Sequence, residues 1–289
     1  MRILVAIVHF WDPHGDGNHQ SLRPDPQPRI RALQEQLLGL RRIGPLQGLL
    51  NIAALQVQNA NQAVRHAIDV KLITDGEHHV LDRLDPAYAG VFEQINTGPP
   101  TGRHLGFEAQ KYLASQLEAG YDLYAYMEDD LIVHDPLFFQ KIAWFAQVKG
   151  PEAVLLPHRM ELWHEPGFID RFYIDGPIDT AVLRDVIPDP QPSMAAAIPG
   201  GEVQFESPLN PHAGCFVLTQ AQLEHWSRQP HWQDGDCSYV SPLESAATLG
   251  LVKTFQLYKT SYSQASWLEL QHWGQNFRCL IGRNVAPME

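Results

Sequence analysis

Residues 121–133 read Tyr-Asp-Leu-Tyr-Ala-Tyr-Met-Glu-Asp-Asp-Leu-Ile-Val, and the interpretation of the whole chain starts from this stretch. Its first seven residues are mostly apolar and aromatic, which is typical of a strand buried inside a sheet. Three carboxylates, Glu128, Asp129 and Asp130, follow that strand without interruption. Charge at the tip of a buried strand is costly unless a partner compensates it, so these residues are the first candidates for a functional site.

Strands and helices alternate on both sides of this stretch. Residues 2–10 form an apolar run that favours a central strand covered on both faces, and a polar loop rich in Gly, Pro, Asp and His follows at 11–28. The further predicted elements up to residue 157 are a helix from Pro28 to Gly44, a second helical stretch between 46 and 67, a strand at 69–74, helices at 104–118 and 137–147, and a strand at 153–157. This alternation indicates an α/β fold, a three-layer αβα sandwich around a mostly parallel sheet.

The second half of the chain is less regular. Between residues 157 and 211 prolines and glycines interrupt the pattern, and only short strands are predicted at 171–174 and 203–205. Regular secondary structure is predicted again after residue 211. It comprises a strand at 213–218, a helix at 219–227 with Thr219 as its N-cap, and a helix at 242–249. We therefore expect one domain over residues 1–289 and no repeats.

The amino-acid composition and net charge disfavour several kinds of partner and cellular location. The chain has 289 residues, 44% of them hydrophobic and 19% charged, which is typical of a folded domain with a substantial core. A formal net charge of −12 disfavours nucleic acid and anionic membranes as partners. No stretch approaches the roughly 18 apolar residues of an integral membrane segment, and three scattered cysteines without a CxxC pair fit a reducing compartment. These features predict a cytoplasmic protein.

The acidic run suits a divalent cation. Three adjacent carboxylates repel one another, and a cation removes that repulsion. Mg²⁺ or Mn²⁺ typically takes one or two carboxylates and fills its remaining positions with water and substrate phosphates. In an extended chain Glu128 and Asp130 would point to one side and Asp129 to the other, so one could hold the cation while a neighbour contacts a ribose or a water. The alternative is a solvated acidic turn.

The stretch around Glu128 resembles the strand and Asp-X-Asp element of glycosyltransferases with the GT-A fold. The Glu-Asp-Asp form is similar to the exostosin-like group among them, and the order of elements along the chain fits as well. The resemblance implies a metal-dependent transfer of a hexosyl or hexosaminyl unit from a nucleotide-sugar, a UDP-sugar in our prediction, to a hydroxyl acceptor. It divides the domain into a nucleotide-sugar-binding half (1–135) and an acceptor-binding half (136–289).

The resemblance also implies roles for particular residues. Asp130 would bind the cation, and His272, in a C-terminal Leu-Gln-His-Trp-Gly segment, would complete the metal shell. Glu244, at the start of a helix, matches the position of a general base, although the usual Glu-Asp pair is reduced to one residue. Residues 212–218 are similar to an acceptor-side turn and strand. The structural alternatives are a helix-dipole role for Glu244 and an ordinary surface or core role for His272.

Four more residues are predicted to contact the nucleotide-sugar together with Glu128 and Asp129. Arg23 and Arg29 lie in or beside the loop after the first strand and are candidates for the diphosphate. Asp75 ends its strand and is a candidate for the base or ribose. Arg103 precedes the acidic strand and is a candidate for phosphate or uracil, with a solvated helix face as the alternative.

Three other functions compete with this prediction. A nucleotidyltransferase would share the fold and the metal, but the loop after the first strand has only Gly15 and Gly17 in place of a Gly-rich signature. A phosphoesterase with two metals would need several clustered Asp and His pairs. The third alternative is a sugar-nucleotide-binding protein without catalytic activity. The chain has no P-loop, no G-x-S-x-G elbow and no HExxH motif.

Overall fold

The computed structural model describes residues 1–15, 17, 19–163 and 169–286. Its central sheet has the strand order β13-β6-β1-β4-β5. These strands are β1 (Arg2–Val8), β4 (Ala67–Thr74), β5 (Glu93–Asn96), β6 (Leu123–Glu128) and β13 (Cys215–Thr219). β1, β4, β5 and β6 are parallel, and β13 joins β6 in the antiparallel sense. The mostly parallel sheet that the sequence predicts is confirmed.

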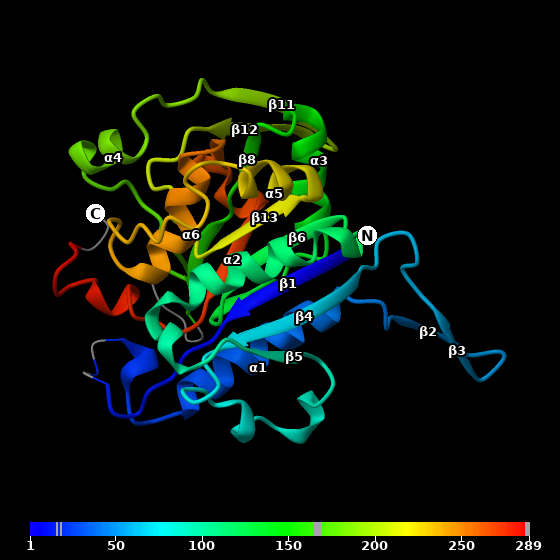
Figure 1. Cartoon of the computed structure of the whole chain (residues 1–289). Coiled ribbons are helices and arrows are strands. Elements are labelled where there is room, and N and C mark those ends of the chain that lie inside the picture. The colour runs from blue at the N-terminus through cyan, green and yellow to red at the C-terminus, as the bar shows by residue number, and fades with distance from the viewer. Residues whose placement is uncertain (16, 18, 164–168, 287–289) are drawn as a thin grey trace.

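Helices cover both faces of this sheet, which makes three layers (Figure 1). They are α1 (Gln27–Arg42), α2 (Leu105–Ser115), α3 (Phe138–Lys149), α5 (Gln220–Ser227) and α6 (Pro242–Val252). Alternate residues of β1 face opposite layers. Ile3, Val5 and Ile7 belong to the core shared with α1 and α3, whereas Leu4 and Ala6 belong to the core shared with α2, α5 and α6. β1 is therefore the central strand that its continuous apolar run predicts.

Two smaller sheets extend the central one. The first has the order β10-β9-β15-β7 and the second the order β11-β12-β14-β8. Their strands are β7 (Leu131–Ile132), β8 (Ala153–Leu155), β9 (His158–Leu162), β10 (Arg171–Tyr173), β11 (Met194–Ile198), β12 (Gly201–Glu206), β14 (Gln256–Thr260) and β15 (Glu269–His272). A short helix, α4 (Thr180–Val186), lies between β10 and β11. The short strands predicted at 171–174 and 203–205 are confirmed as β10 and β12.

Local sequence signals explain several boundaries. Thr219 accepts a hydrogen bond from the Gln222 amide while the Gln222 side chain accepts from the Thr219 amide, so α5 starts with the predicted N-cap inside a capping box. Gly120 adopts a left-handed conformation (φ 70°) at the end of the helical segment that precedes β6, a position that favours glycine. Pro28 lies in the first turn of α1, where its missing amide costs no hydrogen bond.

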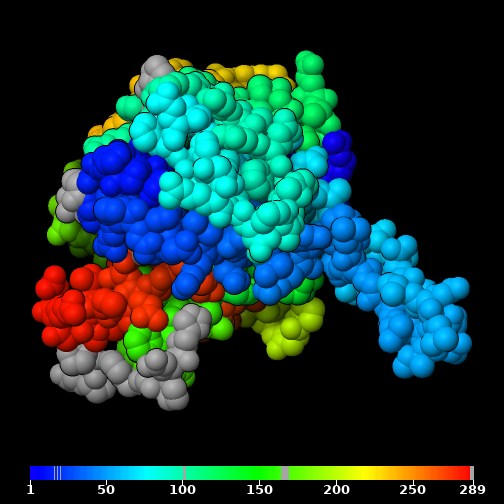
Figure 2. Space-filling model, turned by 90° about the horizontal axis from the view of Figure 1, so that it is seen from below, coloured from blue at the N-terminus to red at the C-terminus, as the bar shows by residue number. Residues whose placement is uncertain are grey.

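The helical stretch predicted at 46–67 is wrong. Residues 48–59 form a hairpin of β2 (Gly48–Asn51) and β3 (Gln56–Asn59) that projects from the body (Figures 1 and 2). The leucine spacing suits a helix, but a helix needs a core against which to bury its apolar stripe. Here no core is available, Gly48 weakens a helix, and Leu55 takes a left-handed conformation (φ 52°) that closes the turn.

The structure also corrects the geometry of the acidic run. β6 ends at Glu128, and Asp129 and Asp130 form a turn before β7. The chain leaves the central sheet here because Leu131 and Ile132 pair with β15 of a different sheet. The alternation of an extended strand therefore stops at Glu128, and the three carboxylates point toward three different sets of partners.

Candidate functional site

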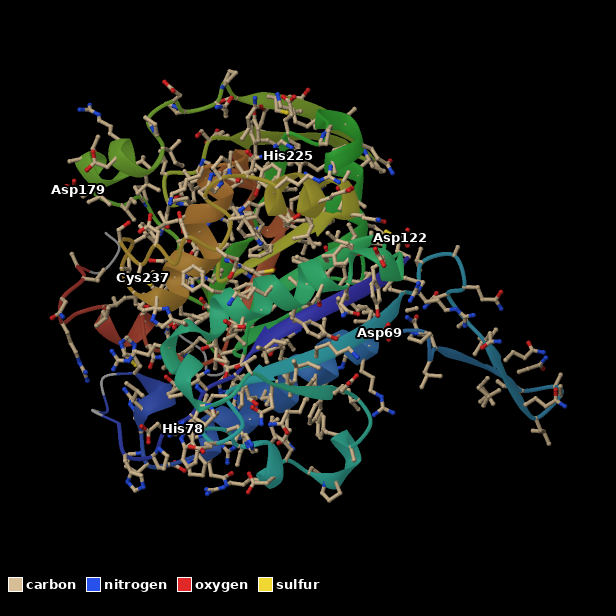
Figure 3. The ribbon with its side chains drawn as sticks, viewed as in Figure 1. Asp69, His78, Asp122, Asp179, His225 and Cys237 are labelled. Atoms are coloured by element: carbon tan, nitrogen blue, oxygen red, sulfur yellow. The ribbon has the colours of Figure 1, made fainter. Side chains whose placement is uncertain are left out.

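The carboxyl ends of three neighbouring parallel strands bring polar residues to one edge of the sheet. Val8 of β1 pairs with Ile73 of β4 and with Glu128 of β6, so the residues that follow each strand lie at the same level. In Figure 3 the strands point toward the end of the molecule where His78 lies, and Asp69 and Asp122 lie at the opposite end. Ligands of open α/β sheets bind outside this edge. We call Glu128, Asp129 and Asp130 at this position the acidic edge.

Asp129 is held by two cationic or polar partners. Its Oδ1 accepts a hydrogen bond from Arg29 Nη1 (2.5 Å), and its Oδ2 lies 2.6 Å from His9 Nδ1. The Val80 amide donates to His9 Nε2 (3.1 Å), so the ring proton resides on Nδ1 and is donated to Asp129. Burial opposes the charge of Asp129, but Arg29 and His9 outweigh it and lower the pKa of this carboxyl. Asp129 is therefore a fixed anion with both oxygens engaged.

Asp130 lies between a cation and an imidazole. Arg29 Nη1 donates to its Oδ2 (3.2 Å), and His272 Nε2 lies 3.7 Å from the same oxygen. Its Oδ1 is buried and has no hydrogen-bond partner among the described residues. On the other side of the ring, His272 Nδ1 lies 3.3 Å from Glu161 Oε1. Burial disfavours a charged imidazole, but Asp130 and Glu161 overcome this and raise the pKa of His272.

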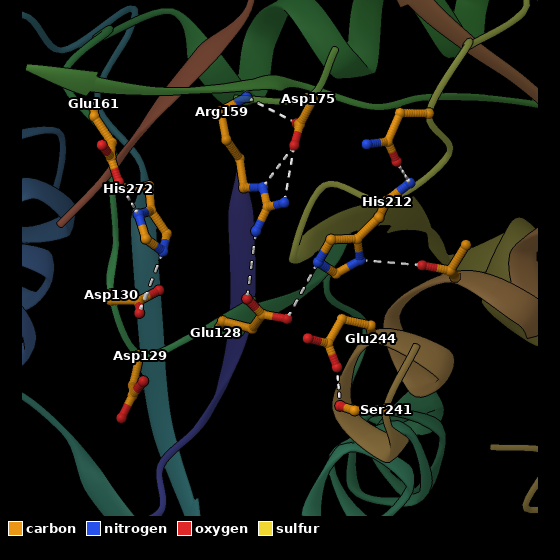
Figure 4. A network of polar contacts seen from close by, with 12 residues as sticks. Glu128, Asp129, Asp130, Arg159, Glu161, Asp175, His212, Ser241, Glu244 and His272 are labelled. Carbon is orange, nitrogen blue, oxygen red and sulfur yellow. Dashed lines mark hydrogen bonds and ion pairs between the residues drawn. The ribbon is translucent and has the colours of Figure 1, made fainter. Parts of the chain in front are cut away.

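Glu128 faces the second half of the chain. Its Oε2 lies 3.8 Å from Arg159 Nη1, and its Oε1 lies 3.7 Å from His212 Nε2 (Figure 4). Burial is the main reason that the pKa of Glu128 is raised to about 8, with repulsion from Asp130 and Glu244 adding to it and Arg159 opposing it. A Cβ on Gly214 would lie 2.6 Å from Glu128 Oε2, and Gly214 has a left-handed backbone (φ 59°), so a larger residue here would be strained and would displace this carboxyl group.

A network of buried charged residues fixes the position of Arg159, the residue that lies beside Glu128. Asp175 accepts from Arg159 Nε (3.0 Å), Arg159 Nη2 (2.8 Å) and Lys259 Nζ (3.0 Å). Lys259 also donates to the His212 carbonyl (2.8 Å). Burial opposes the charge of Asp175, yet Arg159 and Lys259 hold the pKa of this carboxyl well below its usual range. Arg159 is thereby fixed beside Glu128 by a fully ionised partner.

Glu244 lies in the first turn of α6, on the side of Glu128 and His212 (Figure 4). The Ser241 hydroxyl, at the N-cap of this helix, donates to Glu244 Oε2. A carboxylate here also interacts favourably with the helix dipole, so the position suits both the catalytic and the structural alternative. Glu244 is half-buried, which keeps it accessible from the site.

The other residues predicted to contact the nucleotide-sugar differ in whether they belong to this buried centre. Arg29 is buried within it, as described above. Asp75 follows β4 and is buried, but it accepts from the Glu77 and His78 amides and from the His78 ring (2.7 Å), so it shapes its own loop. Arg23 is exposed in the loop after β1, where its Nε donates to the Gly17 carbonyl. Arg103 is exposed in the turn before α2 and is not part of the buried centre.

Sequence reasoning missed five members of the site: His9, Arg159, Glu161, Asp175 and Lys259. His9 had a usable signal, because it is the first polar residue after a buried strand. Arg159 and Glu161 alternate on β9, which lies in the part of the chain where prolines and glycines interrupt the regular pattern. Asp175 and Lys259 are 84 residues apart, and nothing local to either one indicates that they pair.

The donor atoms of the site decide whether it suits a cation. Asp130 offers a buried oxygen, Oδ1, that has no partner among the described residues, and the His272 imidazole lies near the other oxygen, Oδ2, of the same carboxylate. One carboxylate and one imidazole, with water and phosphate in the remaining positions, form a donor set that Mn²⁺ accepts. Among the described residues no group of three His, Cys, Asp or Glu side chains is arranged to hold a metal ion by itself. The residues thus fit a cation that binds together with a phosphate-bearing ligand.

Comparison with known proteins found solved structures only. No family model matches the chain, and no curated protein matches it. One similar structure is a mannose-1-phosphate geranyltransferase from Thermus thermophilus, with 14% identity, 90% of this chain and 73% of that chain covered, and a TM-score of 0.41. Another is TarS of S. aureus, with 10% identity, 95% and 37% covered, and a TM-score of 0.45. A third is a fragment of TarS in complex with UDP-GlcNAc, with 11% identity, 91% and 56% covered, and a TM-score of 0.41.

The chain thus spans about a third of the length of TarS and about three quarters of the Thermus protein. At these identities and TM-scores the likenesses carry no argument about the site or the activity. The predicted α/β fold class, a three-layer αβα sandwich around a mostly parallel sheet, is confirmed by the strand order and layers of the chain itself. Within the described part of the chain, no helix has both the length and the apolar character to cross a bilayer.

Proposed function

We propose that this protein transfers a hexosyl or hexosaminyl unit from a nucleotide-sugar, a UDP-sugar, to a hydroxyl acceptor with the help of Mn²⁺ or Mg²⁺, in the manner of exostosin-like enzymes. One observation carries the proposal. The acidic edge lies at the carboxyl end of the central parallel strands. Oδ1 of its Asp130 is buried without a partner among the described residues, while Oδ2 of the same carboxylate lies 3.7 Å from His272 Nε2. An unpaired carboxylate oxygen in a buried place is costly unless a ligand satisfies it.

Asp130 and His272 would hold the cation, which when bound supplies Lewis-acid stabilisation to the departing nucleoside diphosphate. Arg29 is fixed beside Asp130 and would face the same phosphates. Asp129 holds Arg29 and His9 in place, and Glu128 would face the sugar or the ribose. Arg23, Asp75 and Arg103 lie outside the buried centre and would contact the nucleotide of the bound donor.

Glu244 would accept the proton of the acceptor hydroxyl. A general base needs a carboxylate within hydrogen-bond reach of that hydroxyl and a fixed orientation. The Ser241 hydroxyl engages Oε2 of Glu244 and so directs Oε1 toward the site. The cytoplasmic location and the division into a donor half (1–135) and an acceptor half (136–289) are part of the same proposal, and the site draws residues from both halves.

The test is thermal stabilisation by a panel of nucleotide-sugars, with and without Mn²⁺, because a ligand that binds only the folded state raises the melting temperature. We expect a UDP-sugar to stabilise the protein only when Mn²⁺ is present, and Asp130→Ala to remove the effect. Asp185→Ala, which deletes an exposed carboxylate on α4, is the matched control and keeps the full response. Stabilisation of Asp130→Ala equal to that of the parent protein would contradict the assignment.

The same panel separates the alternatives. Nucleoside triphosphates combined with sugar 1-phosphates would stabilise a nucleotidyltransferase, and stabilisation by these alone would overturn the proposal. Glu244→Gln is expected to bind the donor like the parent protein but to transfer sugar at least about 100-fold more slowly, as loss of a general base predicts. Unchanged turnover in this variant would leave Glu244 with its helix-dipole role only.

A further inference from the structure

The hairpin of β2 and β3, with its flanking residues 44–64, contains none of the charged residue types. We call this segment the arm. Six of its aliphatic side chains are between 57% and 86% exposed: Leu46, Leu49, Leu50, Ile52, Leu55 and Val57. Figure 2 shows the arm standing clear of the body, so its apolar side chains do not pack on the rest of the molecule. An exposed apolar surface of this size marks a contact with another molecule.

The arm has one apolar face. Leu50 pairs with Val57 across the hairpin, so these two side chains lie on the same face. The opposite face carries Leu49 with Gln58, and Asn51 with Gln56. In the turn beyond these pairs, Ile52 and Leu55 are also exposed. A two-stranded hairpin is at best marginally stable by itself, and it gains stability when its apolar face is covered by another layer.

The hydrocarbon core of a lipid bilayer is an unfavourable partner for the apolar face of the arm. The two outer edges of the hairpin present backbone groups without a further strand beside them, and such groups cannot enter hydrocarbon unpaired. Three amide side chains, of Asn51, Gln56 and Gln58, line the other face beside Leu49. The net charge of −12 adds repulsion from anionic lipids.

A second copy of the chain fits the arm better. Two bodies that each carry −12 repel one another, but the arm is uncharged and keeps the bodies apart when arms meet arms. Leu49 lies on the opposite face, so five aliphatic side chains remain for the contact, each with on the order of 100 Å² of apolar surface, or roughly 500 Å² per copy. Two copies therefore bury about 1,000 Å² of apolar surface, which reaches the smallest area expected of a specific protein interface.

The root of the arm supplies a matching hollow. A concavity of about 700 Å³ lies there, lined by Leu46, Gly48 and Val57 together with Gln47, Gln58, Asn59 and Gln62. When two arms cross in antiparallel fashion, the turn of each arm reaches the root of the other. Ile52 and Leu55 of one copy then lie over the hollow of its partner, and both contacts form at once by symmetry.

We propose that the arm is a dimerisation element: two copies of this chain pack the apolar faces of their arms together around a two-fold axis near Leu50. The proposal is independent of the catalytic assignment, because no residue of the acidic edge takes part.

Sedimentation velocity of the full chain over micromolar concentrations tests it. We expect a dimer, and we expect Leu50→Glu to weaken it at least about 100-fold, since two carboxylates would meet in an apolar contact. Val148→Glu places the same charge on an exposed position of α3 and is the control that keeps the dimer. Unchanged near-UV circular dichroism in both variants confirms that the fold is intact.

A mixing experiment adds a second readout. Leu50→Glu and Leu50→Lys are each expected to be monomeric, and an equal mixture is expected to form dimers that contain one of each. A parent chain that stays monomeric, or a dimer that Leu50→Glu does not weaken, would overturn the proposal. Binding of a monomer to neutral phosphatidylcholine vesicles, lost in Leu50→Glu, would overturn it in favour of a lipid surface.

Discussion

The acidic edge and the arm depart from the usual distribution of side chains in opposite directions. At the edge, charged groups are buried: Asp129, Asp130 and Glu128 expose less than a tenth of their surface, and Asp175 behind them is 1% exposed. In the arm, leucine and valine side chains are exposed. Neither arrangement lowers the free energy of the isolated chain, and each becomes favourable when a partner arrives.

The two regions differ in how many of their unfavourably placed side chains already have a partner within the chain. Almost every charge at the edge has a protein partner, because an unpaired ion in the interior would cost several kcal/mol. The arm has no such compensation, because exposed apolar groups cost far less than buried unpaired charges. We therefore expect mutations at the edge to affect the stability of the folded chain strongly, and mutations in the arm to affect it little.

The largest effect is expected from Asp175→Ala. The substitution leaves Arg159 and Lys259 buried without their shared carboxylate, and the free energy of unfolding should fall by about 3–5 kcal/mol. Urea denaturation of the parent and variant measures it, and Asp185→Ala on the surface serves as the control. A loss below about 1 kcal/mol would mean that the buried network is not rigid and that the contrast with the arm is overstated.

A smaller loss of folding stability is expected when the pH is lowered. Burial, aided by Lys259, lowers the pKa of His158 to about 4, so the folded state keeps this ring neutral while the unfolded state protonates it below about pH 6.5. The unfolded state then binds more protons, and stability must fall as the pH falls from 6.5 to 4. The full loss from this group is roughly 3 kcal/mol, or 1.36 kcal/mol for each unit of the shift.

His158→Gln tests this assignment. The variant is less stable at neutral pH but should lose less stability between pH 6.5 and 4 than the parent protein. Equal slopes in the two proteins would show that other groups, such as His212, whose pKa burial also lowers, account for the acid response.

The smallest effect is expected in the arm. At protein concentrations low enough for the chain to be monomeric, Leu50→Glu and Leu55→Ser should change the free energy of unfolding by no more than about 0.5 kcal/mol. Calorimetry on dilute samples measures it. A loss of about 2 kcal/mol or more would show that the arm packs on its own body, and the comparison with the acidic edge would fail.

The predictions from sequence succeeded where the signal is local. The apolar run at residues 2–10, the aromatic strand before Glu128 and the Thr219 cap each depend on neighbouring residues, and each is confirmed. The helix expected at 46–67 failed because leucine spacing does not reveal whether a core exists to cover the helix. The family resemblance assigns Asp130 and His272 to one metal shell. The two side chains lie 3.7 Å apart, and the metal role stays a prediction.

What the sequence alone determined is four of the five strands of the central sheet, its flanking helices and the position of the three carboxylates at a strand end, since periodicity and strand polarity are properties of contiguous residues. The edge strand β5 is too short and polar to be predicted in this way. Tertiary structure decided which charges meet. The partnership of Asp129 with His9 and Arg29, and of Asp175 with Arg159 and Lys259, joins segments up to 120 residues apart. Such pairs form because the fold buries these groups together, and no local pattern in the chain records that burial.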